Sequence, residues 1–266
     1  MGKAPLLSLR GITKNFGAVQ VLDAIDLTVE AGSVTSLVGD NGAGKSTLIK
    51  CIAGIHPIDG GQIYWEGEAV HFSAPKAASA AGIEFVYQDL ALCDNLDIVQ
   101  NMFLGRERKR GILLDHDAME AATREVLAGL SVTTVKSVRL PVATLSGGQR
   151  QSIAVAKAVM WNSKLVVLDE PTAALGVAQT RQVLALVRRL AERGLGVLLI
   201  SHNLEDVFAV SDSIAVLRLG GLVAQVRRSE VNSRQLVELI TTGRMEDPPP
   251  YELGVRSAAA DLGSGA

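Results

Sequence analysis

The chain has 266 residues, of which 48% are hydrophobic and 20% are charged, and its formal net charge is −2. This length suits one large domain, or one domain with a lobe inserted into it, and the apolar fraction is sufficient for a core. The nearly balanced charge argues against a protein that tracks nucleic acid, because such proteins carry long basic patches. The nearest approach to one is the mixed-charge run at residues 106–110, which we interpret as a solvated loop.

The cysteine content and the hydropathy of the chain indicate the cellular compartment in which it works. Two cysteines, Cys51 and Cys93, do not make a disulfide framework, and Cys51 lies in an apolar helical stretch that predicts a buried thiol. The first ten residues lack the apolar segment of a signal peptide. No stretch approaches the roughly 18 apolar residues of a membrane span. We therefore expect the chain to work in a reducing cytosol and, if it serves a membrane, to do so from the surface through a partner.

The first hundred residues predict mostly strands and turns. Runs typical of strands cover residues 6–16, 21–30 and 33–38 and are interrupted by Gly17 and Gly32. A helix is expected from Gly44 to about Ala53, with Gly54 as its stop. Residues 62–65 are then expected to form a strand of a hairpin, after a turn at residues 59–61.

The middle of the chain changes to helical signals over residues 98–140. Apolar residues recur there at helical spacing, with Asp115 or Asp117 as a possible N-cap. The recurring residues are Met119, Ala122, Val126 and Leu130. We expect a helical lobe inserted at about residues 98–160.

Strand and helix alternate again in the last third. Continuous apolar runs at 165–168 and 196–200 predict buried strands, and strands at 213–219 and 222–226 flank a Gly-Gly turn. Between them lies a helical apolar stripe that ends at Gly194 and comprises Val183, Leu184, Leu186, Val187, Leu190 and Ala191. This order indicates an α/β domain over residues 1–243 with a mainly parallel sheet. The proline-rich and small residues of 244–266 predict a disordered tail.

A phosphate-binding loop follows the third predicted strand and opens the first predicted helix. Its pattern G-x-x-x-x-G-K-[ST] is matched at every fixed position. Glycines let backbone N–H groups approach a triphosphate closely, and the helix N-terminus adds partial positive charge. Lys45 supplies a point charge for the β and γ phosphates, and Ser46 a hydroxyl for Mg²⁺. The residues predicted to bind ATP here are Gly39, Asp40, Asn41, Gly42, Ala43, Gly44, Lys45, Ser46 and Thr47. The loop alone does not separate a kinase from a GTPase or a motor.

Two carboxylates end the buried strand at 165–168. At the carboxyl edge of a parallel sheet, Asp169 would face the nucleotide and help to hold Mg²⁺. Glu170 is the candidate general base for the attacking water. Taken alone, each carboxylate could equally be a surface residue at a strand end, and the phosphate loop favours the functional interpretation.

A Ser-Gly-Gly turn opens a predicted helix that runs to about Met160. Ser146 is a typical N-cap, and Gly147 and Gly148 leave their N–H groups uncovered, so this helix end is a second anion site. A capping turn without function would explain the helix alone. With its neighbours it forms Leu-Ser-Gly-Gly-Gln at 145–149, and here the chain resembles the ABC ATPase family, whose signature is this pentapeptide.

The resemblance implies a P-loop NTPase fold of ABC type with an N-terminal antiparallel β subdomain and an inserted helical lobe. In the family, ATP with Mg²⁺ is sandwiched between the phosphate loop of one subunit and the signature of another. For this chain the signature residues would be Ser146, Gly147, Gly148 and Gln149. Because the chain has one copy of each motif, twofold pairing would give two identical sites in a closed, ATP-bound homodimer.

Three further residues match the family pattern. Gln88 matches the glutamine that contacts Mg²⁺ and the attacking water, and without the resemblance it would be an ordinary polar loop residue. His202, after a predicted strand, matches the histidine that contacts the γ-phosphate, whereas an isolated histidine there is usually structural. Phe16 matches the aromatic that stacks on adenine, and an ordinary core phenylalanine is the alternative.

One position departs from the family. Gly176 stands where most ABC ATPases carry Asp in a loop that crosses the dimer interface, so a contact there is in doubt. Gly176, Val177 and the segments 84–92 and 101–105 resemble the monosaccharide-import branch of ribose and fructose type. That resemblance implies a single-module ATPase at the cytoplasmic face of the inner membrane, with integral permease subunits and a sugar-binding protein as partners.

Other classes remain open at this point. An ABC ATPase of non-transport type would act on nucleic acid or ribosomes, but it usually carries coiled-coil arms, zinc motifs or paired modules, which the sequence does not show. A subunit that serves a cargo other than sugar is also compatible, because the ATPase does not contact the cargo. A small-molecule P-loop kinase would need no partner, and the signature pentapeptide argues against it.

Overall fold

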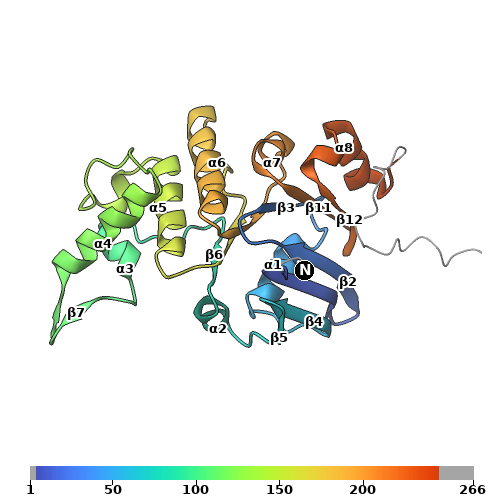
Figure 1. Ribbon diagram of the computed structural model, residues 1–266, viewed down its shortest axis with the longest axis horizontal. Coiled ribbons are helices and arrows are strands. Elements are labelled where there is room, and N and C mark those ends of the chain that lie inside the picture. Colours follow the sequence, from blue (N-terminus) through green and yellow to red (C-terminus); the bar gives the residue numbers. More distant parts are fainter. Residues whose placement is uncertain (1–3, 246–266) are drawn as a thin grey trace, which may run out of the picture.

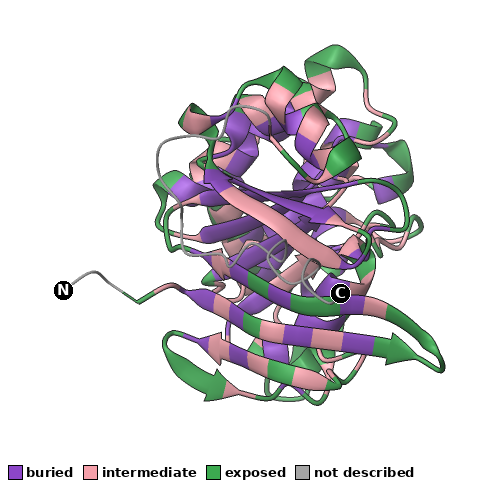
Figure 2. Ribbon diagram, turned by 90° about the vertical axis from the view of Figure 1, so that its right-hand side faces the viewer, coloured by how far each residue is buried: buried purple, intermediate pink, exposed green. Residues whose placement is uncertain are grey.

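The computed structural model describes residues 4–245, and its first half contains an antiparallel sheet. The four strands, in the order β2-β1-β4-β5, are β2 (Val19–Val29), β1 (Leu7–Phe16), β4 (Gly60–Trp65) and β5 (Glu68–Val70). Buried and exposed residues largely alternate along β1, as a sheet with one covered face requires (Figure 2). The strand predicted at residues 62–65 lies within β4, but the turn predicted before it at 59–61 is wrong, because β4 already begins at Gly60 and its hairpin with β5 turns at 66–67.

A second, six-stranded sheet forms the centre of the molecule. Its order is β12 (Gly221–Arg227), β11 (Ser213–Arg218), β3 (Val34–Val38), β10 (Gly196–Ile200), β9 (Leu165–Asp169) and β6 (Ile83–Val86). Neighbouring strands are parallel except β12, which pairs antiparallel with β11. Every residue of β3 and β10 is buried, because both faces of this sheet are covered. The predicted α/β class with a mainly parallel sheet is confirmed.

Helices flank the central sheet (Figure 1). They are α1 (Lys45–Ile52), α2 (Pro75–Ala80), α6 (Val177–Glu192), α7 (Leu204–Val210) and α8 (Ser233–Thr242). All six residues of the stripe predicted for α6 are buried. Two short 3₁₀ turns, Val142–Thr144 and Arg228–Glu230, complete the regular structure outside the lobe helices.

The inserted lobe contains α3 (Ile98–Phe103), α4 (His116–Gly129) and α5 (Gly147–Val159) and lies beyond the β6 edge of the sheet (Figure 1). Asp115 is the N-cap of α4, where its Oδ1 accepts a hydrogen bond of 3.0 Å from the Ala118 amide. One apolar cluster extends from Phe103 and Val155 in the lobe to Leu199 in the sheet. The lobe is therefore packed against the sheet rather than tethered to it.

The prediction of helix throughout residues 98–140 is partly wrong. Two short strands, β7 (Lys109–Arg110) and β8 (Leu113–Leu114), form a hairpin between α3 and α4, and residues 130–141 contain no helix. Gly111 has a φ of 68°, which starts the two-residue turn of the hairpin. Strand β6 was not predicted either, because its four residues are placed in the sheet by pairing with the distant strand β9.

Both cysteines are free, and Cys51 is buried as predicted. Burial raises the pKa of the Cys51 thiol to about 11, so it is a protonated core residue at neutral pH. Between residues 4 and 245, no helix is long and apolar enough to cross a membrane. Most of the predicted disordered tail, residues 246–266, lies outside the described residues, and Met245 still packs against the cluster beneath α8.

Candidate nucleotide-binding site

The phosphate loop connects the central strand β3 to α1, and its conformation requires glycine at two positions. Gly39 has a φ of 152°, and a Cβ there would overlap the carbonyl oxygen of Leu217. Gly44 is the N-cap of α1 with a φ of 106°, and a Cβ there would lie 2.9 Å from Leu22 Cδ2. No side chain caps α1, so its first amides are available to an anion.

Lys45 folds back onto the loop that contains it. Its Nζ donates hydrogen bonds to the carbonyl oxygens of Gly39 at 2.6 Å and Asp40 at 2.9 Å. Burial lowers the pKa of Lys45, while the charges of Glu170, Asp40 and Asp169 act in the opposite direction. The ammonium group is thus held at the rim of the loop, where phosphate oxygens would take over its hydrogen bonds.

A cleft of about 430 Å³ opens beside this loop. It is lined by residues from widely separated parts of the chain, because the carboxyl ends of parallel strands β3, β9 and β10 meet at one edge of the sheet. The lining residues are Val21, Asn41, Gly42, Gly44, Lys45, Ser46, Thr47, Gln88, Asp169, Glu170, Ala173, Ile200 and His202. The structure therefore brings together every candidate catalytic and metal residue that the sequence proposed.

Glu170 and His202 form a pair at the far wall of the cleft. His202 Nδ1 lies 2.8 Å from Glu170 Oε2, and the histidine is largely exposed while the carboxylate is largely buried. Glu170 has a φ of 51°, in the left-handed region, and its amide donates to the Ile200 carbonyl at 3.0 Å. Such a backbone conformation costs a non-glycine residue about 1–3 kcal/mol and is typical of functional sites. It turns the chain sharply after β9, at the residue whose side chain contacts His202.

A buried hydrogen bond that braces the segments of this pair was not predicted from the sequence. Thr172 Oγ1 donates a hydrogen bond of 2.6 Å to Asp206 Oδ2, and both residues are buried. Thr172 lies two residues after Glu170, and Asp206 lies four residues after His202. The bond joins the two segments that carry the catalytic candidates. The only sequence signal was the pair of acidic residues in the first turn of α7, Glu205 and Asp206, which by itself does not indicate a contact with Thr172.

Asp169 and Ser46 offer hard oxygen donors on the same cleft. Burial raises the pKa of Asp169, the charge of Glu170 raises it further, and Lys45 acts against both. A cation beside this carboxylate would offset the cost of its burial. Among residues 4–245, no cluster of three or more His, Cys, Asp or Glu side chains could hold a metal alone. The donor set therefore suits Mg²⁺ that is also coordinated by phosphate oxygens and water.

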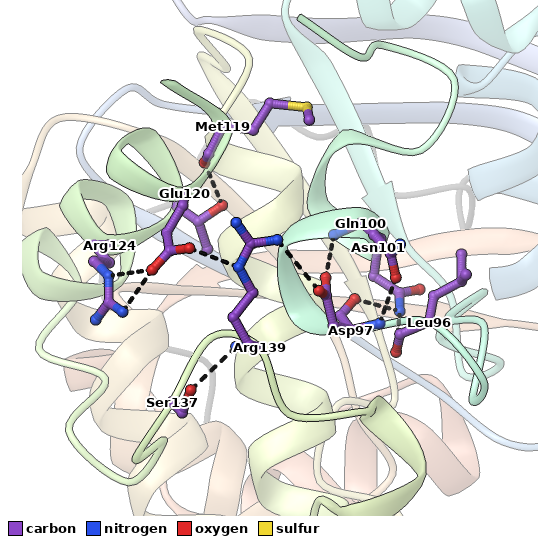
Figure 3. Close-up of polar contacts among 10 residues, drawn as sticks. Leu96, Asp97, Gln100, Asn101, Met119, Glu120, Arg124, Ser137 and Arg139 are labelled. Atoms are coloured by element: carbon purple, nitrogen blue, oxygen red, sulfur yellow. Dashed lines mark hydrogen bonds and ion pairs between the residues drawn. The ribbon is translucent and has the colours of Figure 1, made fainter. Parts of the chain in front are cut away.

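Gln88 follows β6 and is exposed on the cleft, and the loop behind it is fixed to the lobe. The buried side chain of Asn101 accepts a hydrogen bond from the Cys93 amide at 2.7 Å. Its Nδ2 donates to three carbonyls of the loop, those of Cys93, Leu96 and Asp97, at 2.9–3.3 Å. Figure 3 shows Asn101 beside Leu96 and Asp97 at the start of α3, together with Arg139, which bridges Asp97 and Glu120 of α4. Residues 93–97, which follow Gln88, are thereby held against the lobe.

The Ser146 turn is built as predicted but does not line the cleft. Ser146 Oγ accepts from the Gln149 amide at 3.4 Å, and Gln149 Oε1 accepts from the Ser146 amide at 2.9 Å, which is a capping box. Ser146 and Gly147 are exposed. Figure 1 shows α5 in the lobe and α1 in the core, well separated. This chain alone does not bring its two anion sites to one nucleotide.

Phe16 also lies outside the cleft lining, at the end of β1. Its side chain is exposed, which excludes the alternative of an ordinary core phenylalanine. The ring meets His56 edge to face at 5.2 Å and has the ammonium of Lys14 5.5 Å from its centre. An exposed aromatic surface is thus available, and its contact with adenine stays a prediction.

The fold and the cleft define a P-loop nucleotide-binding domain with a helical lobe inserted between two strands of its sheet. A family model described as ABC transporter matches residues 22–173, which is more than half of the chain. The chain belongs to the ABC transporter family. The predicted resemblance and the ABC-type fold are thereby confirmed.

Several named proteins are similar to this chain over almost its whole length. The fructose import ATP-binding protein FrcA of Rhizobium meliloti is 44% identical over 94% of this chain and 98% of its own length. A xylose/arabinose import ATP-binding protein of Sulfolobus acidocaldarius is also 44% identical, over 89% and 94%. A ribose import ATP-binding protein of Yersinia pestis is 38% identical over 93% of this chain, which spans only 48% of that protein.

Solved structures agree with the fold. The ADP conformation of an ATP-binding cassette of an ABC transporter superposes with a TM-score of 0.77 at 26% identity, covering 90% of this chain and 96% of the other. A nucleotide-free cassette gives a TM-score of 0.75 at 26% identity, with coverage of 84% and 92%. Nucleotide binding is therefore a property of this structural class.

Proposed function

We propose that this chain is the ATP-hydrolysing subunit of an importer of monosaccharides. The observation that carries this proposal is the single cleft in which Lys45, Glu170 and His202 meet. As an ABC transporter ATPase, the chain couples hydrolysis to transport, and its relatives of similar length are designated import proteins for fructose and for xylose or arabinose. Gly176 and the segments 84–92 and 101–105 support the same branch.

The residues of the cleft support a division of roles in ATP binding. The amides of residues 39–46 and the ammonium of Lys45 hold the β and γ phosphates, since both are donors at the same rim. Ser46 and Asp169 would hold Mg²⁺ with Gln88 at its edge. When bound, the ion neutralises charge that develops on the phosphate oxygens. Phe16 offers its exposed ring to adenine.

The Glu170–His202 pair supports hydrolysis by direct attack of water. The water oxygen bonds to the γ phosphorus while the bond from phosphorus to the bridging oxygen breaks, and ADP leaves with that electron pair. Glu170 accepts the water proton, because it is the carboxylate that the left-handed turn fixes at the cleft. His202, 2.8 Å from Glu170, orients the carboxylate and donates toward the γ-phosphate from its exposed edge.

Two copies of the chain complete the site. The turn that begins at Ser146 would bind the γ-phosphate held by the Lys45 loop of the other copy, through the exposed Ser146 and Gly147 and the amide of the buried Gly148. Such contacts exist only when the dimer is closed, so ATP shifts the population toward it and hydrolysis releases it. Gln149 holds this turn through its capping box and through the Thr134 carbonyl, to which its Nε2 donates at 2.6 Å.

The Gln88 loop supports coupling to a permease. It lines both the nucleotide cleft and a second groove, whose wall includes Leu92, Asp94 and Arg150 of the lobe. A change at the γ-phosphate can therefore reach a surface of the lobe through one short segment. We infer that integral permease subunits dock there, at the cytoplasmic face of the inner membrane, and that a separate sugar-binding protein selects the cargo. We propose no nucleic-acid partner for this chain.

Reconstitution tests the function. The chain should co-purify with a polytopic permease, and proteoliposomes containing both, supplied with the sugar-binding protein, should take up labelled fructose, ribose or xylose only with MgATP. Glu170→Gln should retain ATP binding and lower phosphate release at least 100-fold, because the general base is lost while the shape is kept. ATPase activity stimulated by nucleic acid, or transfer of phosphate to a small acceptor, would contradict the proposal.

A further inference from the structure

The β7–β8 hairpin carries an apolar tip that nothing in the described chain covers. Ile112 is 97% exposed and Leu113 is 71% exposed, and Leu114 beside them is exposed as well. The two-residue connection of Gly111 and Ile112 places these side chains at the end of the hairpin. Large aliphatic side chains grouped at a protruding tip are unusual on a surface that meets only water.

Basic residues flank this tip on the first strand of the hairpin. Residues 106–110 contain four basic residues and one acidic residue. Lys109 and Arg110 are exposed, and among residues 4–245 neither side chain makes a hydrogen bond or salt bridge to a carboxylate, although the charge of Lys109 contributes to lowering the pKa of Glu107. The solvated loop expected from the sequence is thus an ordered hairpin with aliphatic residues at its end and free cations at its flank.

The base of the hairpin is fixed to the molecule. The guanidinium of Arg106 lies 5.1 Å from the centre of the Trp161 ring, donates to Ser79 Oγ at 2.9 Å and pairs with Glu84. Arg108 lies over Phe103 at 5.5 Å. These contacts use the two basic residues nearest the body and leave the outer two free. In Figure 1 the hairpin extends away from the lobe at one end of the molecule, opposite α8.

We propose that this hairpin, residues 106–114, binds an anionic lipid surface, with Ile112 and Leu113 entering the headgroup region and Lys109 and Arg110 lying against lipid phosphates. Aliphatic side chains flanked by Lys and Arg are the composition of interfacial membrane anchors. A cytoplasmic loop of a permease fits less well, because such loops carry an excess of Lys and Arg and would repel the hairpin. The rigid base means that little entropy is lost on binding.

Vesicle partition of the full chain tests the proposal. Binding to vesicles of equal phosphatidylglycerol and phosphatidylcholine is compared with binding to pure phosphatidylcholine by flotation at low salt. We expect binding to the anionic vesicles that falls as salt is added. Ile112→Ser with Leu113→Ser should weaken it at least tenfold, and each of Lys109→Gln and Arg110→Gln about fivefold.

Matched controls lie on α8 at the opposite end of the molecule. Val237→Ser removes an exposed aliphatic residue, and Arg234→Gln removes an exposed cation, so both should leave vesicle binding unchanged. Because the hairpin is outside the nucleotide cleft, the hairpin variants should release phosphate at the rate of the parent. Loss of lipid binding with intact ATPase activity therefore separates this inference from the proposed function.

A fluorescence measurement of how deeply residue 112 enters the bilayer tests the proposal even if the chain floats weakly with the vesicles. The Trp emission of Ile112→Trp, after subtraction of the parent, should shift to the blue and be quenched by brominated lipid. Hairpin and α8 variants that bind equally, a tryptophan at 112 that stays in water, or binding only to vesicles that contain the permease would each overturn the proposal. The last result would assign the hairpin to a protein partner.

Discussion

At the scale of single residues, we expect the Asp169 carboxylate to lower the stability of the nucleotide-free fold while it contributes to binding MgATP. Burial is the main cause that raises the pKa of the Asp169 carboxyl in the folded state. Above that raised pKa the folded protein carries a buried charge, which lowers its stability. Below the ordinary value of 3.8 the carboxyl is protonated in both the folded and the unfolded state, so this loss of stability is absent. Asp169→Asn should therefore raise the Tm of the nucleotide-free protein at pH 7, and the gain should disappear as the pH falls toward 3.8. The same variant should bind MgATP more weakly, because a carboxylate oxygen is lost. Thermal unfolding at pH 7 and near pH 4 checks the prediction, and an equal gain at both would contradict it.

Gly176, the departure from the family pattern, is not required by the backbone. Its φ of −74° and ψ of 161° suit any N-cap residue, and a Cβ there would meet no atom within 4 Å. Gly176→Asp should stabilise the nucleotide-free chain by about 0.3–1 kcal/mol, because a carboxylate would cap α6 and favour its N-terminal dipole. Gly176→Ala is the matched control and should give no gain. Urea unfolding of both variants measures the difference.

At the scale of elements, packing requires glycine at only one of the two signature glycine positions, Gly148. A Cβ on Gly148 would lie 2.9 Å from Gln179 Cβ of α6, whereas a Cβ on Gly147 would lie 3.0 Å from the flexible end of Leu175. Gly148→Ala should therefore cost about 1–3 kcal/mol of unfolding free energy, because a backbone-fixed atom must move. Gly147→Ala should cost less, because the leucine can change rotamer. Similar losses in denaturant unfolding of the two would contradict this account.

The contact between α3 and the Gln88 loop is a second property of elements. Asn101→Ala should cost about 1–3 kcal/mol, since it leaves the Cys93 amide and loop carbonyls without partners in a buried place. Amide hydrogen exchange over residues 88–97 should accelerate more than exchange elsewhere. Gln100→Ala, next to it, loses only the bond from the Asp97 amide in the capping box and should leave the loop protected. Equal exchange in both variants would show that Asn101 does not hold the loop.

For the whole molecule, the separation of the two anion sites predicts an ATP-dependent dimer. Glu170→Gln should be monomeric with ADP and dimeric with saturating MgATP, because hydrolysis no longer opens the closed state. Adding Ser146→Arg to that variant should keep it monomeric while ATP still binds, since the Ser146 turn is outside its own cleft. Light scattering after size exclusion measures both. A Glu170→Gln chain that stays monomeric in MgATP, even with its permease, would contradict the shared site.

Local patterns in the sequence predicted a large part of the molecule. The phosphate loop, the carboxylates after β9, the Ser146 capping turn and the stripe of α6 each depend on residues close together in the chain, where spacing and composition determine conformation. The helix expected over residues 98–140 was partly wrong because a glycine turn and long-range packing outweighed weak periodicity. Strand β6 was missed for a related reason: its position comes from pairing with β9, about 80 residues away.

The sequence by itself determined which chemical groups the protein carries and that they belong to a P-loop ATPase with a signature turn. Only the tertiary structure decided that Gln88, Glu170 and His202 share one cleft, that Thr172 and Asp206 brace it, and that the Ser146 turn lies elsewhere. It also decided that Ile112 and Leu113 are exposed at a hairpin tip. The physical reason is that these relations join segments far apart in the chain, and only strand order and packing in space bring them together or hold them apart.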